Sequence, residues 1–138
     1  MAVANVTTAS AVATSGATEA TIVTVASERE ATPGSPATGA AVAGVRVQGL
    51  LVGTVPGSAT AAVVRVRAGS LVGTAVGTIT YAVTASTTGV PLPFDFLDTT
   101  NAPGSTDYFV TVSYTSGSGA GAISVATVSA SVVAVSQT

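Results

Sequence analysis

The sequence predicts an all-β chain, folded as an antiparallel β-sandwich of about eight strands. Val, Thr, Ala and Ser alternate along most of the 138 residues, with the period of two that half-buried strands show. No stretch sustains a helical repeat, and the helix formers Glu, Lys and Gln are scarce or absent. Turns that contain Gly or Pro separate the alternating segments at intervals typical of a sandwich.

The beginning of the chain is its least regular part. Residues 1–18 are small and polar-leaning without clear periodicity, and we expect a flexible or extended N-terminal arm there. The first convincing strand is Thr21 to Val25, which is β-branched throughout. We expect residues 19–138 to form a single sandwich domain, because a chain of this length suits one core.

Two central strands have distinct inner and outer faces. In the strand over residues 45–55, the inner face is predicted to carry Val45, Val47 and Leu51. The strand over residues 62–67 is predicted to place Val64 and Val66 inward. Three arginines of these strands point outward: Arg46, Arg65 and Arg67.

The later strands follow the same logic. Residues 76–83 place Ile79 and Tyr81 on one face, and a short strand follows with Phe94 and Phe96 on one side and Asp95 opposite. In the next strand Tyr108, Val110, Val112 and Tyr114 share a face. The last strand, residues 122–135, is expected to keep Ile123 and Val125 in one register and Val128 in the other.

Several classes of function are disfavoured by composition. Only 7% of the residues are charged, against about 25% in an ordinary soluble domain. A net charge of −2 does not fit nucleic-acid binding or polybasic membrane association. No apolar run reaches transmembrane length, and the first residues do not resemble a secretory signal.

An enzyme is not expected, and neither is a cofactor. His, Lys and Cys are absent, so Ser and Thr have no side-chain base, and a thiolate metal site is impossible. Asp95 and Asp98 lie three residues apart in a strand and should point to opposite faces, which argues against a paired-carboxylate site. We expect Asp98 to accept backbone N–H bonds in a turn. A calcium site is disfavoured, because the Asp-x-Asp-x-Asp-Gly spacing is missing.

Two kinds of sandwich fit these strands, the jelly roll and the immunoglobulin type. The immunoglobulin type lacks its Cys…Trp…Cys signature here, which favours a jelly roll with an extended N-terminal arm. Sugar binding would need exposed aromatic platforms. The tyrosines Tyr81, Tyr108 and Tyr114 have the phase of core residues with their hydroxyls at a sheet edge.

One succession of segments resembles a known family. Val45-Arg46-Val47-Gln48-Gly49 begins a strand that ends at Pro56-Gly57, and it is followed by residues 62–69, 73–77, 93–98 and 108–112. Over roughly residues 40–135 this resembles the small jelly-roll virion proteins of tailed bacteriophages, such as capsid decoration or cement proteins and fibre-base modules. The resemblance implies a homotrimer in the virion, seated on the major capsid protein, with its N-terminal arm reaching a neighbour.

We therefore expect a non-enzymatic virion structural protein that decorates and stabilises a phage capsid. A β surface with so little charge is poorly protected against association, so a subunit in an assembly is the simplest interpretation. Arg46, Arg65 and Arg67 are the candidate interface residues, with solvated or carboxylate-paired arginines as the alternative. The alternative function is a receptor- or glycan-binding jelly-roll module of a tail fibre or surface adhesin.

Overall fold

The computed structural model describes residues 5–15, 19–26, 40–100, 106–116 and 120–136. These residues form strands and turns, with no helix among them. The strands are β1 (Asn5–Ser15), β2 (Ala20–Ala26), β3 (Ala40–Gly53), β4 (Ala61–Ala68), β5 (Ala75–Ala82), β6 (Val90–Asp98), β7 (Asp107–Thr115) and β8 (Ala120–Ser136). The prediction of an all-β chain is confirmed for this part of the sequence.

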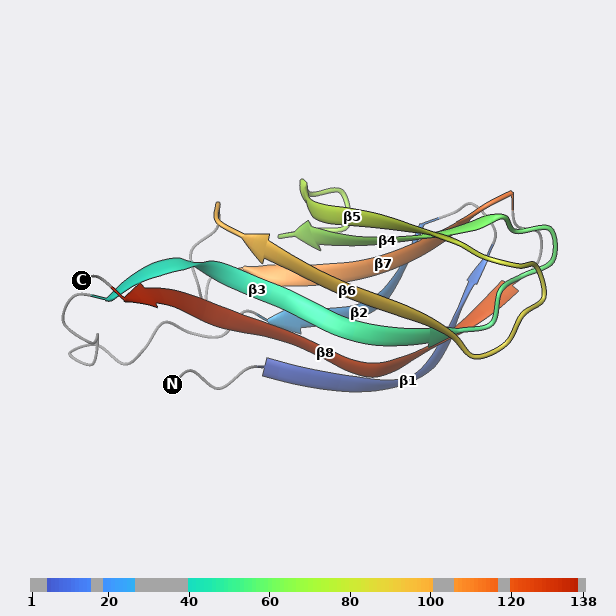
Figure 1. The fold of residues 1–138 in the computed structure, drawn as a ribbon, viewed down its shortest axis with the longest axis horizontal. Coiled ribbons are helices and arrows are strands. Elements are labelled where there is room, and N and C mark those ends of the chain that lie inside the picture. Colours follow the sequence, from blue (N-terminus) through green and yellow to red (C-terminus); the bar gives the residue numbers. More distant parts are fainter. Residues whose placement is uncertain (1–4, 16–18, 27–39, 101–105, 117–119, 137–138) are drawn as a thin grey trace.

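The strands make two four-stranded antiparallel sheets, which Figure 1 shows as two layers. One sheet has the order β1-β8-β3-β6 and the other the order β2-β7-β4-β5. The arrangement is consistent with a β-sandwich. Hydrogen-bonded pairs are nested along the chain: β4 with β5, β3 with β6, β2 with β7, and β1 with β8.

The core lies between the facing sheets, and the predicted inner faces supply it. Val45, Val47 and Leu51 of β3 are fully buried. On β4 the side chains alternate, so that Val64 and Val66 are fully buried and the residues between them are partly exposed. This alternation is what a period of two produces when one sheet face meets apolar side chains and the other meets water.

The last strand corrects one prediction. Ile123, Val125 and Val128 are all buried, although the alternation had placed Val128 on the opposite face. The cause is a register shift in β8, where Leu50 of β3 pairs with Thr127 and Leu51 pairs with Val125. The extra residue of such a bulge turns every later side chain to the other face.

The N-terminal segment is extended and paired. Asn5–Ser15, which lies within the predicted arm of residues 1–18, forms β1 and runs antiparallel to β8. Residues 1–4 and 16–18 of that arm lie outside the described residues. No pattern in the sequence predicts this pairing, because the segment has no alternation that marks an inner face.

The four edge strands differ in how they discourage pairing with other chains. β6 carries Pro91, Pro93, Asp95 and Asp98, and prolines and charges are typical of protected edges. β1, β2 and β5 contain neither proline nor a charged residue. Among the described strands, the sheet β2-β7-β4-β5 is therefore bounded by two strands without these protective residues, which we call unprotected.

Candidate interaction surfaces

Arg46 lies on the outer face of β3 and is paired with Asp95 of β6. Its Nε donates to Asp95 Oδ1 at 2.8 Å, and its Nη2 contacts Oδ2, so the pair is bidentate. The two side chains are about half exposed, at 48% and 49%. The hydrogen bond from Arg46 holds the pKa of Asp95 below its ordinary value. This pairing leaves the outer face of the sheet locally neutral.

Arg67 makes a second bidentate pair on the outer face of the other sheet. Its Nε and Nη2 donate to the two carboxylate oxygens of Glu19, at 2.8 and 3.0 Å. Its Nη1 donates to the carbonyl oxygen of Gly73 at 2.9 Å, which ties the β4–β5 loop to the strand. The hydroxyl of Thr111 also donates to Glu19. Thr111 is fully buried, although its strand position faces outward.

Arg65 differs from the other two arginines. Its Nη1 donates to Ser113 Oγ on the neighbouring strand at 3.3 Å. Within the described part of the chain, ion pairs are formed by Arg46 and Arg67, and Arg65 is not in one. The pKa of Glu19 is lowered mainly by the hydrogen bond from Arg67. The positive charge of Arg65 lowers this pKa further.

The three arginines do not form one surface. Arg65 and Arg67 lie on β4, whereas Arg46 lies on β3 in the other sheet. The outer faces of the two sheets point away from each other, so Arg46 does not share a surface with Arg65 and Arg67. Alternation reveals which residues share a face of one strand, but it does not reveal which sheet the strand joins. Arg46 and Arg67 are each paired with a carboxylate, as the alternative to an interface role describes.

Asp95 and Asp98 do not converge on a common site. Asp95 is exposed on the outer face, while Asp98 is 4% exposed at the end of β6. Asp98 Oδ1 accepts the backbone N–H of Thr100 at 2.8 Å, which confirms the predicted turn. Asp98 Oδ2 accepts the hydroxyl of Tyr108 at 2.7 Å. The pKa of Tyr108 is raised above its ordinary value, mainly because the hydroxyl is buried and secondly because it is bonded to Asp98.

The tyrosines mostly behave as core residues. Tyr108 and Tyr114 are 0% and 1% exposed, as their phase in the strand predicted. Tyr81 is partly buried on β5 and donates its hydroxyl to the carbonyl oxygen of Pro93 on β6. None of these three rings is offered as an open platform.

Apolar exposure gathers on one flank of the sandwich, where β5 and β6 form the edges of the two sheets. Partly buried apolar side chains that pack against the core come from these strands and the segments beside them: Ala68, Val76, Ile79, Tyr81, Val83, Val90 and Phe96. The exposed large apolar side chains of the described residues are Leu71 and Val72 in the β4–β5 loop and Leu97 on β6. We call these ten residues the β5–β6 flank. Sequence reasoning missed it, because strand phase does not say which strands become edges.

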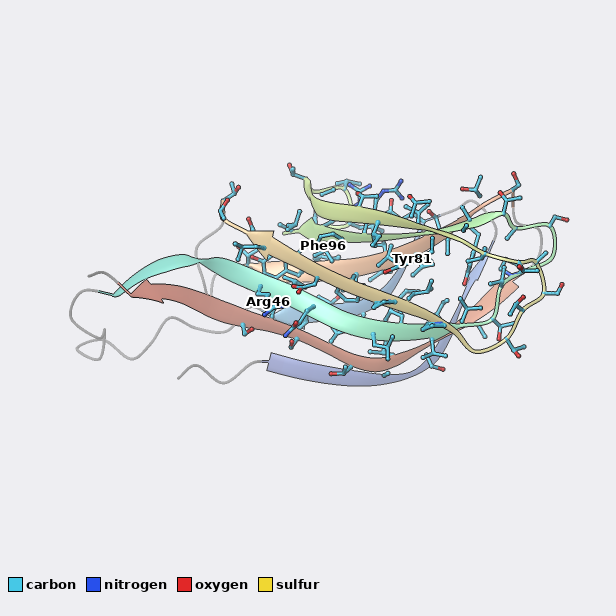
Figure 2. All side chains as sticks on the ribbon, viewed as in Figure 1. Arg46, Tyr81 and Phe96 are labelled. Atoms are coloured by element: carbon cyan, nitrogen blue, oxygen red, sulfur yellow. The ribbon has the colours of Figure 1, made fainter. Side chains whose placement is uncertain are left out.

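Phe96 closes part of this flank against β5. A Cβ atom placed on Gly77 would lie 2.1 Å from Cδ1 of Phe96, so the ring rests directly on the glycine backbone. The side chains of Tyr81 and Phe96 lie between the two edge strands (Figure 2). At one end, a groove of about 320 Å³ runs between the β4–β5 loop and the end of β6, lined partly by Ala68, Val76 and Leu97.

The Glu19–Arg67 pair predicts an acid-dependent loss of stability. Because the pKa of Glu19 in the folded chain is lowered from 4.5, its contribution is complete above about pH 4.5. It is lost as the pH falls through the lowered value. We expect Glu19→Gln to reduce the free energy of unfolding at pH 7 by about 1–2 kcal/mol.

Urea unfolding between pH 3 and 7 measures this effect. The difference between wild type and Glu19→Gln should shrink below pH 4.5. Asp95→Asn is the matched control, since it removes the more exposed carboxylate of the other pair and should change stability less. A difference for Glu19→Gln that stays constant down to pH 3 would contradict the assignment.

Other kinds of site find little support among the described residues. No group of three or more His, Cys, Asp or Glu side chains is placed there to hold a metal ion. None of the described residues form a helix that could cross a membrane. Comparison with protein-family models, curated proteins and solved structures gave no match.

Proposed function

We propose that this chain is a non-enzymatic structural subunit, a jelly-roll protein that decorates and stabilises a phage capsid in the virion. The jelly-roll part of the proposal is supported by the strand order. Pairs nested from β4–β5 outward to β1–β8 describe one long hairpin, rolled so that successive pairs alternate between the two sheets. A jelly roll is a sandwich of eight strands in two sheets, with two Greek keys.

The observation that carries the structural role is the β5–β6 flank. Its exposed large apolar side chains are Leu71, Val72 and Leu97, and the others are partly buried against the core. Apolar exposure that gathers on one side of a molecule favours an interaction site. The arginines paired with carboxylates neutralise parts of both outer faces, so little charge opposes a close approach. Burial of such a surface contributes roughly 25 cal/mol per Å² before the costs of association. This favours contact with sister subunits and a shell over the capture of a small molecule.

The molar mass of the purified chain tests this role. Light scattering over a hundredfold range of concentration should report a stable multiple of the 13.1 kDa chain mass. The resemblance to decoration proteins implies three copies, and any stable oligomer supports the structural role. A chain that stays at 13.1 kDa throughout would contradict it.

The alternative function is a glycan- or receptor-binding module of a tail fibre or adhesin. It is less well supported, because Tyr108 and Tyr114 are buried and the hydroxyl of Tyr81 is bound to Pro93. A glycan-array screen separates the two functions. A decoration subunit should bind no glycan, and selective binding of one sugar class would favour the alternative.

A further inference from the structure

We infer that two copies of this chain join through β5, antiparallel and about a two-fold axis, so that their β2-β7-β4-β5 sheets become one continuous sheet. This inference rests on the proposed structural role and names the partner and the edge. Among the described strands, β5 pairs with β4 on one side only. An edge strand leaves alternate N–H and C=O groups unpaired, and these are a template for another strand.

The occupant is a second copy because the surface is complementary to itself. β5 has the sequence Ala-Val-Gly-Thr-Ile-Thr-Tyr-Ala, without charge or proline, so two such strands meet without like-charge repulsion. A two-fold axis also brings the apolar β5–β6 flank of one copy against that of the other, as an isologous interface requires. β2 is equally uncharged, but its core-facing Ile22 and Val25 are already 5% and 1% exposed. Apolar surface left to bury is therefore found beside β5.

The other sheet cannot continue in the same way. Its edge on this flank is β6, which carries Pro91 and Pro93 and lacks the N–H donors of those positions. The pairing is therefore confined to one of the two sheets, and the β6 strands meet through side chains such as Phe96. This geometry builds assemblies from two-fold pairs, in place of the three-fold ring that the resemblance implies.

The register follows from the faces of β5. Gly77 to Ala82 pair with β4 without interruption, while a shift separates them from Ala75. Residues directly opposite each other in an antiparallel pair lie on the same face of the sheet. The two-fold axis must therefore lie where one residue faces its own counterpart in the second copy. Ile79 and Thr80 lie equally near the middle of the regular part, and we place the axis at Ile79. That choice sets Thr78 of each copy opposite Thr80 of the other on the outer face, and cross-strand Thr pairs are favourable.

Substitution of one edge residue tests the surface. Thr80→Lys places a charge on the open edge of β5, opposite Val63 of the same copy and, in the inferred register, opposite Thr78 of the second copy, whose partner on β4 is Arg65. We expect the molar mass to fall twofold, to that of a single chain, with the circular dichroism spectrum kept. Thr24→Lys is the matched control, because it makes the same change at an exposed position of the other unprotected edge, β2. It should leave the mass unchanged.

Disulfide trapping tests the register. The chain has no cysteine, so Thr78→Cys and Thr80→Cys each introduce one thiol. In a mixture the two thiols face each other at roughly 5 Å between Cα atoms, within the range of a disulfide. In either variant alone they are diagonal neighbours at about 8 Å, beyond that range. Oxidation should therefore give a disulfide-linked dimer in the mixture, several-fold more than in either variant alone.

The outcomes separate this inference from the proposed function. Suppose that the wild type is oligomeric. If Thr80→Lys is then equally oligomeric, or if no dimer is trapped in the mixture, the β5 pairing is overturned and the structural role is still supported. Equal trapping in a single variant overturns the register. Wild type that is monomeric at every concentration overturns both.

Discussion

Asp98→Ala should reduce the free energy of unfolding by about 3 kcal/mol, because it removes a buried acceptor of two hydrogen bonds. Asp98 is 4% exposed. Its carboxylate accepts a hydrogen bond from Tyr108 Oη of β7 at 2.7 Å and another from the backbone N–H of Thr100, after β6, at 2.8 Å, so it joins two parts of the fold. Bonds to a charged group contribute about 1.5–3 kcal/mol each, and the Tyr108 hydroxyl would be left buried without this acceptor.

A double-mutant cycle with Tyr108→Phe isolates the bond between the two side chains. Tyr108→Phe keeps the ring in the core and removes the hydroxyl, so it should cost less than Asp98→Ala. The two changes together should cost less than their sum, because they share one interaction. Urea unfolding at pH 7 measures all four proteins. A loss below about 0.5 kcal/mol for Asp98→Ala, as for an ordinary surface change, would show that this carboxylate does not stabilise the turn.

Gly44→Ala is the second substitution with a large expected effect, about 3 kcal/mol of lost stability. Gly44 lies at a register shift between β3 and β8 and has a φ of 155°, which disfavours any residue with a side chain. A Cβ atom there would lie 2.3 Å from the carbonyl oxygen of Asp98. That oxygen belongs to the paired strand β6, so the backbone of β3 or β6 must move.

Gly69→Ala separates the two causes. Gly69 also has a positive φ, 84°, but a Cβ atom there would meet nothing within 4 Å. It should therefore cost only the backbone strain, about 1 kcal/mol. Thermal or urea unfolding compares the two variants. Equal losses would mean that the contact with Asp98 contributes nothing at Gly44.

The faces of the strands could be predicted from the sequence, and their partners could not. A period of two identified the buried valines of β3 and β4 and the buried Tyr108 and Tyr114, because one sheet face meets the core. It failed at Val128, where a bulge reverses the phase without any signal in the composition. It also gave no warning that β1 pairs with β8, since a segment of small residues fits either face.

The candidate site was predicted less well than the fold, for a related reason. Arg46, Arg65 and Arg67 were correctly placed on outer faces, but whether they share a surface depends on which sheet each strand joins. Edges arise in the same way. The sequence of β5 shows that it carries no charge or proline, yet only the strand order reveals that it has one neighbour among the described strands.

Amide hydrogen exchange of the unmodified chain tests the covered β5 edge most directly. At a concentration where the chain is associated, we predict that the amides of Ala75–Ala82 that point away from β4 exchange slowly. Dilution to the point of dissociation should accelerate them at least tenfold, while the amides of Ala20–Ala26 keep their rates. Exchange in β5 that is fast and identical at both concentrations would contradict the account, because this strand would then face water in the associated state as well.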